Sequence, residues 1–398
     1  MRHGIPEASV MLIILITGML PLLSQGAEED PTTLAAVWTF VKEDDEATFW
    51  KLAWSPDGTM IAATFFDNKC LILDAEDGTV IEELDMSDHI TRCDGFAPEG
   101  TLPLRACAFS PDGKWLATGG DDLVVRLFST EDWHLERTFT GHTGSVLCLD
   151  FSPDSRYLAS GSGTDKVIPQ NAGENVTRVW DLETGEEAAL LQGHRDGVLA
   201  VKWNGDGTRI ATASDDRTLR IWSFPGGEEL LLMKGHTSGL LDVDWSPDGS
   251  VLITGSRDYK IKKWNATTGE ELATWQDYNC VRSVDVHPNG EIAATSGVDL
   301  TLKVRDMESG LELKVIKDGV EQKAMVMSSR WSPDGTGIAA GYGKSHTVIM
   351  YEFGRGSSDS GDGTDSTLMV VIILFLLAFF GTVIIMYPAF RELRRRRD

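Results

Sequence analysis

The chain has 398 residues and a formal net charge of −25, and 42% of its residues are hydrophobic. It is long enough to bury a core, and its acidity argues against a nucleic-acid partner, because the phosphate backbone is itself negative. Five cysteines in a chain of this length exclude a dense disulfide framework. The sequence contains no Walker loop, no metal-spaced Cys/His cluster and no nucleophile elbow, so we predict no catalytic site, no metal and no cofactor.

The N-terminus has the three parts of a secretory signal. Arg2 precedes an apolar run from Val10 to Leu23, and small residues follow at Gly26 and Ala27. We therefore predict that residues 1–26 are a signal peptide. The apolar run is short for a helix that spans a membrane, and an uncleaved signal anchor is the alternative.

A short turn recurs seven times along the chain. Its copies are Ser55-Pro56-Asp57-Gly58, Ser110-Pro111-Asp112-Gly113, Ser152-Pro153-Asp154-Ser155, Asn204-Gly205-Asp206-Gly207, Ser246-Pro247-Asp248-Gly249, His287-Pro288-Asn289-Gly290 and Ser332-Pro333-Asp334-Gly335. The third residues of successive copies are 55, 42, 52, 42, 41 and 45 positions apart. A period near 40 in strand-rich units predicts a β-propeller, in which one unit cannot bury its apolar face without its neighbours.

A column of bulky residues keeps register with these turns. Three residues before the Asp or Asn of each turn stand Trp54, Phe109, Phe151, Trp203, Trp245, Val286 and Trp331. We expect this bulky column to pack between neighbouring repeats.

Each repeat divides into four short strands bounded by Gly, Asp and Pro. In the fifth repeat the expected strands are Gly239–Trp245, Val251–Gly255, Lys260–Trp264 and Glu271–Trp275. The last repeat stops after its third strand, at Phe353, and Leu34–Phe40 can supply the missing outer strand. We therefore predict an all-β, seven-bladed β-propeller over residues 33–353, whose N-terminal strand closes the last blade and leaves no open sheet edge at the seam.

At these residues the chain resembles the WD-repeat family. Gly-His pairs stand at Gly141-His142, Gly193-His194 and Gly235-His236, and a Trp-Asp pair closes one repeat at Trp180-Asp181. TolB-like propellers also carry Ser-Pro-Asp-Gly turns, but the Gly-His and Trp-Asp columns favour the WD-repeat family. Together with the membrane features below, the resemblance favours a prokaryotic or archaeal-like source.

The resemblance implies a buried polar network in three blades, in which a Gly-His imidazole bonds an Asp of the turn between the second and third strands, and a hydroxyl links on to a Trp. The residues that match are His142, Ser160, Asp165 and Trp180, then His194, Thr212, Asp216 and Trp222, then His236, Thr254, Asp258 and Trp264. A linked network of this kind fixes strand register. Because the His–Asp pair recurs once per blade, it is not read as a catalytic dyad. The other four blades lack the Gly-His pair.

Two repeats are longer than their neighbours. One excess, Ser87–Pro103, joins the outer strand of blade 1 to the inner strand of blade 2, and the other, Lys166–Asn175, joins the second and third strands of blade 3. Links of these two kinds lie on the same face of a four-stranded up-and-down propeller. Recognition residues commonly lie on loops that a rigid scaffold carries. The candidate partner-binding residues are His89, Arg92, Phe96, Pro98 and Ile168.

The C-terminal part of the sequence predicts a membrane anchor. Residues 354–366 form a Gly/Ser/Asp-rich linker, 367–387 is an uncharged stretch long enough for a transmembrane helix, and 388–398 is a basic tail. Basic residues that flank a span stay on the cytoplasmic side, so we expect a single-pass protein of the cell membrane with its propeller outside the cytoplasm.

An oxidising compartment would permit covalent modifications of the propeller. Cys70 and Cys93 are expected on the same face of the ring, so a disulfide between them is feasible. Cys107 and Cys148 fall in inner strands and are expected to be buried thiols. Asn175 and Asn265 each begin an Asn-X-Thr sequon and are possible N-glycosylation sites.

We interpret the sequence as a non-enzymatic, membrane-anchored scaffold that binds a protein or another extracytoplasmic macromolecule. WD-repeat relatives are mostly rigid scaffolds, and this step rests on the resemblance. The alternative is a propeller enzyme, or a sensor of small ligands or glycans, that uses the central channel. That alternative requires acidic or His side chains to converge on the channel from different blades.

Overall fold

A computed structural model describes residues 34–42, 48–86, 102–163, 173–317 and 323–353. The chain divides into one unit up to Gly354 and a second unit from Arg355, and the second lies wholly outside the described residues. The predicted signal peptide, linker, membrane span and basic tail also fall outside them. No helix within the described ranges is long and apolar enough to cross a membrane.

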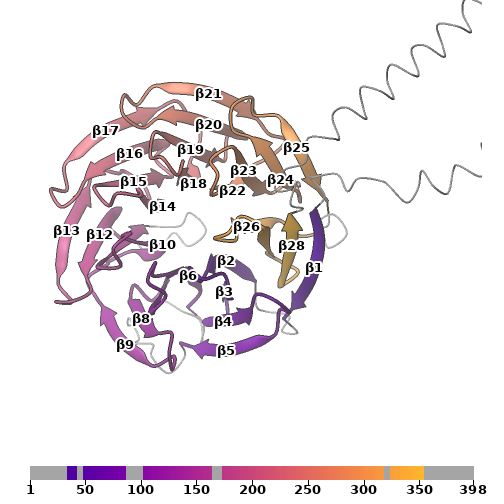
Figure 1. Cartoon of the computed structure of the whole chain (residues 1–398). Helices are drawn as coiled ribbons and strands as arrows, with labels where there is room; N and C mark the ends of the chain where they lie inside the picture. The colour runs from indigo at the N-terminus through magenta and orange to yellow at the C-terminus, as the bar shows by residue number, and fades with distance from the viewer. Residues whose placement is uncertain (1–33, 43–47, 87–101, 164–172, 318–322, 354–398) are drawn as a thin grey trace, which may run out of the picture. The chain divides into compact units, whose positions relative to one another are not determined.

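The described residues form seven four-stranded antiparallel sheets arranged around a common centre (Figure 1). Blade 1 contains β2 (Phe49–Trp54), β3 (Met60–Phe65), β4 (Lys69–Asp74) and β5 (Val80–Asp85). Blade 2 contains β6 (Leu104–Phe109), β7 (Trp115–Gly120), β8 (Val125–Ser129) and β9 (Leu135–Phe139). Blade 3 contains β10 (Ser145–Phe151), β11 (Tyr157–Gly163), β12 (Val176–Asp181) and β13 (Glu187–Gln192). Blade 4 contains β14 (Val198–Trp203), β15 (Arg209–Ser214), β16 (Thr218–Ser223) and β17 (Glu229–Lys234).

The remaining three blades complete the ring. Blade 5 contains β18 (Leu240–Trp245), β19 (Val251–Ser256), β20 (Lys260–Asn265) and β21 (Glu271–Gln276). Blade 6 contains β22 (Val281–Val286), β23 (Ile292–Gly297), β24 (Leu302–Asp306) and β25 (Glu312–Ile316). Blade 7 contains β26 (Val326–Trp331), β27 (Gly337–Tyr342), β28 (Thr347–Phe353) and β1 (Leu34–Val41). The four strands expected in blade 5 match the observed ones to within one residue at each end.

The two ends of the described propeller meet in blade 7, as the sequence predicts. Strand β1 pairs antiparallel with β28, and Leu34 lies opposite Phe353. The Trp38 side chain ties this strand to blade 1 as well, because its indole N–H donates to the Ala75 carbonyl over 2.9 Å. The seam between the first and last repeats is therefore covered by backbone pairing and by a side-chain contact to the next blade.

The repeated turn has its composition because of a local hydrogen-bond cycle. In blade 5 the Ser246 hydroxyl donates to Asp248 over 2.5 Å and accepts from the Val251 amide over 3.0 Å. The Asp248 carboxylate also accepts the Ser250 amide, and Gly249 takes a φ of 67°, which only glycine adopts without strain. This turn joins the first strand of a blade to the second, and we call the side of the ring that carries it the turn face.

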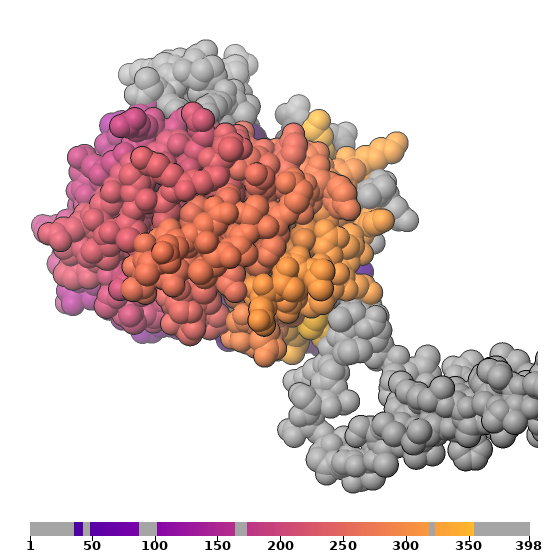
Figure 2. Space-filling view, turned by 90° about the horizontal axis from the view of Figure 1, so that it is seen from above, coloured from indigo at the N-terminus to yellow at the C-terminus, as the bar shows by residue number. Residues whose placement is uncertain are grey.

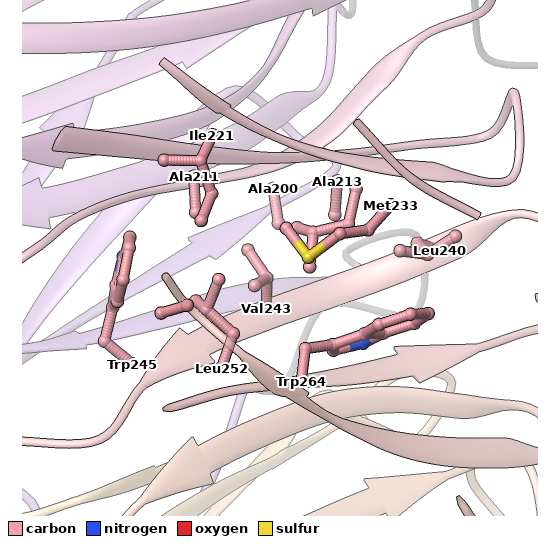
Figure 3. Packing of buried hydrophobic residues seen from close by; sticks show 12 residues of the cluster. Ala200, Ala211, Ala213, Ile221, Met233, Leu240, Val243, Trp245, Leu252 and Trp264 are labelled. Carbon is pink, nitrogen blue, oxygen red and sulfur yellow. The ribbon is translucent and has the colours of Figure 1, made fainter. Parts of the chain in front are cut away.

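The core is divided into layers that lie between blades. Between blades 4 and 5, for example, residues of both sheets interdigitate around Trp245 and Trp264 (Figure 3). The members of that cluster are Ala200, Ala211, Ala213, Leu219, Ile221, Met233, Leu240, Val243, Trp245, Leu252, Trp264 and Ala266. Viewed from the side, blades 4 to 6 form a continuous wall, coloured red to orange (Figure 2). The bulky column thus packs between blades, and each blade buries its apolar surface only against its neighbours.

Candidate functional site

The polar network that the family resemblance implies is assembled in blades 4 and 5. In blade 5, His236 lies 2.8 Å from Thr254 Oγ1 through Nε2 and 2.9 Å from Asp258 Oδ2 through Nδ1, and the Trp264 indole N–H donates to the same hydroxyl over 2.9 Å. Blade 4 repeats this geometry. His194 lies 2.7 Å from Thr212 and 2.9 Å from Asp216, and Trp222 donates to Thr212 over 2.8 Å.

These carboxylates are held in their charged form by hydrogen bonds. Burial alone would raise the pKa of Asp258, but hydrogen bonds from the His236 ring and the Thr237 amide outweigh burial and lower it to about 2. The pKa of Asp216 is lowered in the same way, with His194 as the main partner. The His and Asp side chains lie in links between strands, and their hydrogen bonds join these links to the second and third strands of the blade. Their role is therefore structural.

Blade 3 builds a shorter version of the network. His142 Nε2 lies 2.7 Å from the Ser160 hydroxyl, to which the Trp180 indole donates over 2.8 Å. Asp165 lies outside the described residues, and the nearest described carboxylate, Glu174, is 3.7 Å from His142 Nδ1. Burial, together with the nearby Arg178, lowers the pKa of His142 to about 3, so this imidazole is neutral at physiological pH.

Blade 6 replaces the network with charges that sequence reasoning missed. Arg305 occupies the position of the strand Trp, and its Nε donates to Thr295 over 3.2 Å. Its Nη2 bonds Asp277 over 2.7 Å and Glu312 over 2.8 Å. Lys303 also pairs with Asp277. The sequence does contain one sign of this replacement: the Arg305-Asp306 pair stands where blades 3, 4 and 5 have a Trp followed by Asp, Ser or Asn.

The five candidate partner-binding residues fall in the two insertions and lie outside the described residues. The links that contain them join β5 to β6 and β11 to β12, and the strand ends that they connect lie on the side opposite the turn face, which we call the insertion face. Among the described residues, this face carries Tyr278, which is 82% exposed, and Tyr259, which is 45% exposed. The Asp277 amide donates to the Tyr259 carbonyl over 2.7 Å, which brings the two tyrosine-bearing links together.

The insertion face also carries an aromatic residue with two guanidinium groups close to its ring. Trp50, near the start of β2, has the Arg105 guanidinium 4.6 Å and the Arg282 guanidinium 5.3 Å from its ring centroid. These three side chains come from blades 1, 2 and 6. They form a cation–π stack beside the central channel, which sequence spacing alone does not reveal.

Of the residues predicted to be modified, the structure describes Cys70, Asn175 and Asn265. Cys70 is a fully buried free thiol, and Cys93 lies outside the described residues, so their pairing stays a prediction. Cys107 and Cys148 are buried thiols, as expected. Of the two sequon residues, Asn175 is half-buried, and Asn265 accepts the amides of Thr267 and Thr268, both over 2.9 Å.

The centre of the ring gathers charged side chains from five neighbouring blades. They occupy the position immediately before the bulky column in the innermost strands, where blades 3 to 7 have Asp150, Lys202, Asp244, Asp285 and Arg330. Blades 1 and 2 have alanine at this position. Two residues earlier in their strands, Lys51 and Asp242 add a second level of charge. The sequence does contain this pattern, but only the closed ring shows that its members meet.

Three of these carboxylates join neighbouring blades through the backbone. Asp150 accepts the Trp203 amide, Asp244 the Val286 amide and Asp285 the Trp331 amide, each over 2.7 Å. Each bond runs from one blade to the bulky-column residue of the next. Where the position carries a cation, its backbone carbonyl is the acceptor instead: the indoles of Trp245 and Trp54 donate to the carbonyls of Lys202 and Arg330, both over 3.1 Å.

In the channel, nearby cations offset the effect of burial on the pKa of only some of the carboxylates. Burial raises the pKa of Asp150 to about 6, against the opposing influence of Lys202. Burial likewise raises the pKa of Asp285 to about 7, with Arg330 opposing and Asp244 adding to the rise. Asp242 is different, because direct contact with Arg330 over 2.9 Å and the proximity of Lys51 outweigh burial and lower its pKa.

Comparison with protein families supports the repeat assignment. The model described as "WD domain, G-beta repeat" matches residues 96–129, 133–168, 185–223, 227–265 and 269–306. The model described as "Anaphase-promoting complex subunit 4 WD40 domain" matches residues 32–96.

Several characterised proteins resemble part of the chain. A chromatin assembly factor 1 protein of Gallus gallus is 28% identical over 138 residues, which are 29% of this chain and 23% of that protein. Coronin-7 of Mus musculus is 32% identical over 108 residues, or 25% of this chain and 11% of that protein. The chromatin assembly factor 1 subunit FAS2 homolog of Oryza sativa subsp. japonica is 36% identical over 121 residues, or 29% and 22%. The chain thus spans less than a quarter of each relative, and these eukaryotic relatives lend no support to a prokaryotic source.

Replacing Trp264 with alanine should destabilise the fold. The side chain is 2% exposed and ends a polar network, so the loss of its ring and of its bond to Thr254 should lower the free energy of unfolding by about 3–5 kcal/mol. Denaturant unfolding measures this change. Leu272→Ala on the outer strand of the same blade, where the side chain is 49% exposed, is the control and should stay within about 0.5 kcal/mol of wild type. Equal stability of the two variants would contradict the network.

Replacing Asp285 with asparagine should stabilise the propeller at alkaline pH. The amide oxygen can still accept the Trp331 N–H, while a carboxylate whose pKa is raised to about 7 is removed. A raised carboxyl pKa makes the folded state lose stability as pH rises from the unfolded pKa towards the folded one. The melting temperature of the variant should therefore exceed that of wild type above about pH 7, and the gap should shrink towards about pH 4. A gap that widens on acidification would show that the sign is wrong.

Proposed function

The chain belongs to the WD40-repeat family, and on that premise we propose that it is a non-enzymatic scaffold, anchored in the cell membrane, that binds another protein outside the cytoplasm. Propellers of this family provide rigid surfaces for protein interaction. The proposal assigns partner binding to the insertion face.

The observation that carries the binding role is the difference between the two faces of the ring. On the turn face the links between the first and second strands are short, and each is closed by its own Ser–Asp or Asn–Asp hydrogen bonds in most blades. On the insertion face two links are lengthened, and the described residues there include the exposed Tyr278 and the Trp50 stack. Exposed aromatic side chains such as Tyr278 on a rigid scaffold are typical of protein interfaces.

Sequence features support the membrane placement. The uncharged stretch 367–387 is followed by five arginines between residues 391 and 397, which favours a cytoplasmic tail. The chain leaves the propeller after β28, the third strand of blade 7, which ends on the turn face. A tether that starts there favours presentation of the insertion face away from the membrane.

A second candidate function is a small-ligand sensor that uses the central channel. It is favoured by the convergence of charged residues from six blades, which such a role requires. The two functions occupy different parts of the ring and are compatible in one molecule.

Protease added to intact cells that express the chain should remove the propeller and leave a fragment that contains the basic tail. We expect this cleavage because, in the proposed orientation, the propeller and the linker 354–366 lie outside the cell and are accessible to the protease. An antibody against an epitope fused after Asp398 detects the fragment. Protection of the whole chain in intact cells, with cleavage only after lysis, would contradict the proposed placement.

Shortening both insertions, by residues 88–99 and 166–172, should reduce the recovery of partner proteins from detergent-solubilised native membranes. Tyr278→Ala should reduce it as well, because this ring is almost fully exposed on the same face. The control is Glu183→Ala, which removes an 80% exposed side chain from the turn face of blade 3. Mass spectrometry of captured proteins, with melting temperatures of all variants, provides the comparison. Unchanged recovery by the folded variants would place recognition elsewhere.

A further inference from the structure

The central channel contains a cavity of about 180 Å³ that the scaffold role does not use. Its walls come from the innermost strands of all seven blades and include Lys51, Asp150, Lys202, Asp242, Asp285 and Arg330. The lining runs from the third residue before the bulky column to the column itself. The cavity therefore lies in the half of the channel near the turn face, away from the insertions.

Small side chains on one part of the wall leave room in front of the charged arc. Ala53, Ala106, Ala108 and Ala200 all line the cavity, and Ala53 and Ala108 stand at the height where blades 3 to 7 carry charge. The space corresponds to roughly six water molecules at about 30 Å³ each. A ligand with a comparable number of non-hydrogen atoms would fit.

The two lysine ammonium groups lack close partners. Lys51 Nζ is 3.8 Å from Asp242 Oδ1, and Lys202 Nζ is 3.9 Å from both Asp150 Oδ1 and Asp244 Oδ1. These separations exceed the usual hydrogen-bond length of about 2.8–3.0 Å. Among the described residues neither ammonium group has a hydrogen-bond acceptor, although the Lys51 and Lys202 side chains are only 20% and 26% exposed.

The carboxylates are fixed in place and present their second oxygen without a close partner. The Oδ2 atoms of Asp150 and Asp285 are held by backbone amides of the following blade. Their Oδ1 atoms have only distant cations within the described part of the chain, at 3.9 Å from Lys202 and 3.7 Å from Arg330. Rigid groups of both signs thus have unused hydrogen-bonding capacity in one cavity.

We propose that the channel cavity binds a small zwitterion, an α-amino acid with a short side chain, whose ammonium group contacts the Oδ1 atoms of Asp150 and Asp285 and whose carboxylate contacts Lys51 and Lys202. A ligand with one charge would satisfy only one of the two sets of groups and would leave the other buried and unpaired. A zwitterion supplies donors to the carboxylates and acceptors to the ammonium groups. Preorganisation by the inter-blade hydrogen bonds lowers the cost of ordering the site.

Isothermal titration calorimetry of the purified full-length chain tests the proposal. The probes are glycine, alanine and serine, with acetate and methylammonium as matched ligands that carry one of the two charges. We expect at least one amino acid to bind with a dissociation constant of about 1 mM or lower, and each single-charge probe to bind at least about tenfold more weakly. No heat from any amino acid up to about 10 mM, or equal binding of a single-charge probe, would overturn it.

Two channel variants and two outer variants locate the binding. Asp285→Asn and Lys51→Met should each weaken amino-acid binding at least about tenfold. Asp77→Asn and Lys69→Met make the same chemical changes on the outer part of blade 1 and should leave binding unchanged, because Asp77 lies in a turn and Lys69 pairs with Glu83 on the rim. Since Asp285→Asn is expected to stabilise the fold at alkaline pH, weaker binding by this variant at pH 8 would not reflect unfolding. Wild-type affinity in both channel variants would overturn the proposal.

Discussion

Packing of one blade against the next is the interaction on which the rest of this molecule depends. A four-stranded sheet has two faces, and here each face is buried only by a neighbouring blade, so no blade has a core of its own. The cluster between blades 4 and 5 draws residues from both sheets, with Trp245 and Trp264 at its two ends. Such an arrangement is complete only when the ring closes, which explains why the N-terminal strand β1 pairs with β28.

Packing between blades is reinforced at the channel by two kinds of polar contact. Where the residue before the bulky column is an aspartate, its carboxylate accepts a backbone amide from the next blade. Where that residue is a cation, an indole of the next blade donates to its carbonyl. Among the described residues, no Trp of the bulky column makes both kinds of contact. Trp203 and Trp331 donate their backbone amides to aspartates, and their indole N–H groups have no acceptor. The charge of the channel and the joining of the blades are therefore two properties of one sequence position.

The two faces of the ring differ in how closely the chain is constrained. The turn-face links between first and second strands have little conformational freedom. In most of these turns a Ser or Asn side chain donates a hydrogen bond to the Asp two residues later, and a glycine, or Ser155 in blade 3, takes the positive φ that the turn requires. Links on the insertion face vary in length and expose aromatic residues such as Tyr278. Because the strands are held by pairing within each sheet and by packing between blades, changes in the insertion-face links need not disturb the blades. A propeller can in this way combine a constant frame with a variable recognition surface.

The sequence by itself determined the repeat, the number of blades, the strands of each blade and the closing strand, because these depend on local turn chemistry and on period-two alternation within a few residues. It also pointed to the residues that meet in blades 4 and 5, where Gly-His and Trp stand at regular spacings. Only the tertiary structure decided which charges share the channel, since Lys51 and Arg330 are close solely because the ring closes. The replacement of the blade 6 network by Arg305 and Asp277 was likewise decided there. Spacing reports which face of a strand a side chain occupies, whereas the partner across a ring depends on closure of all seven blades.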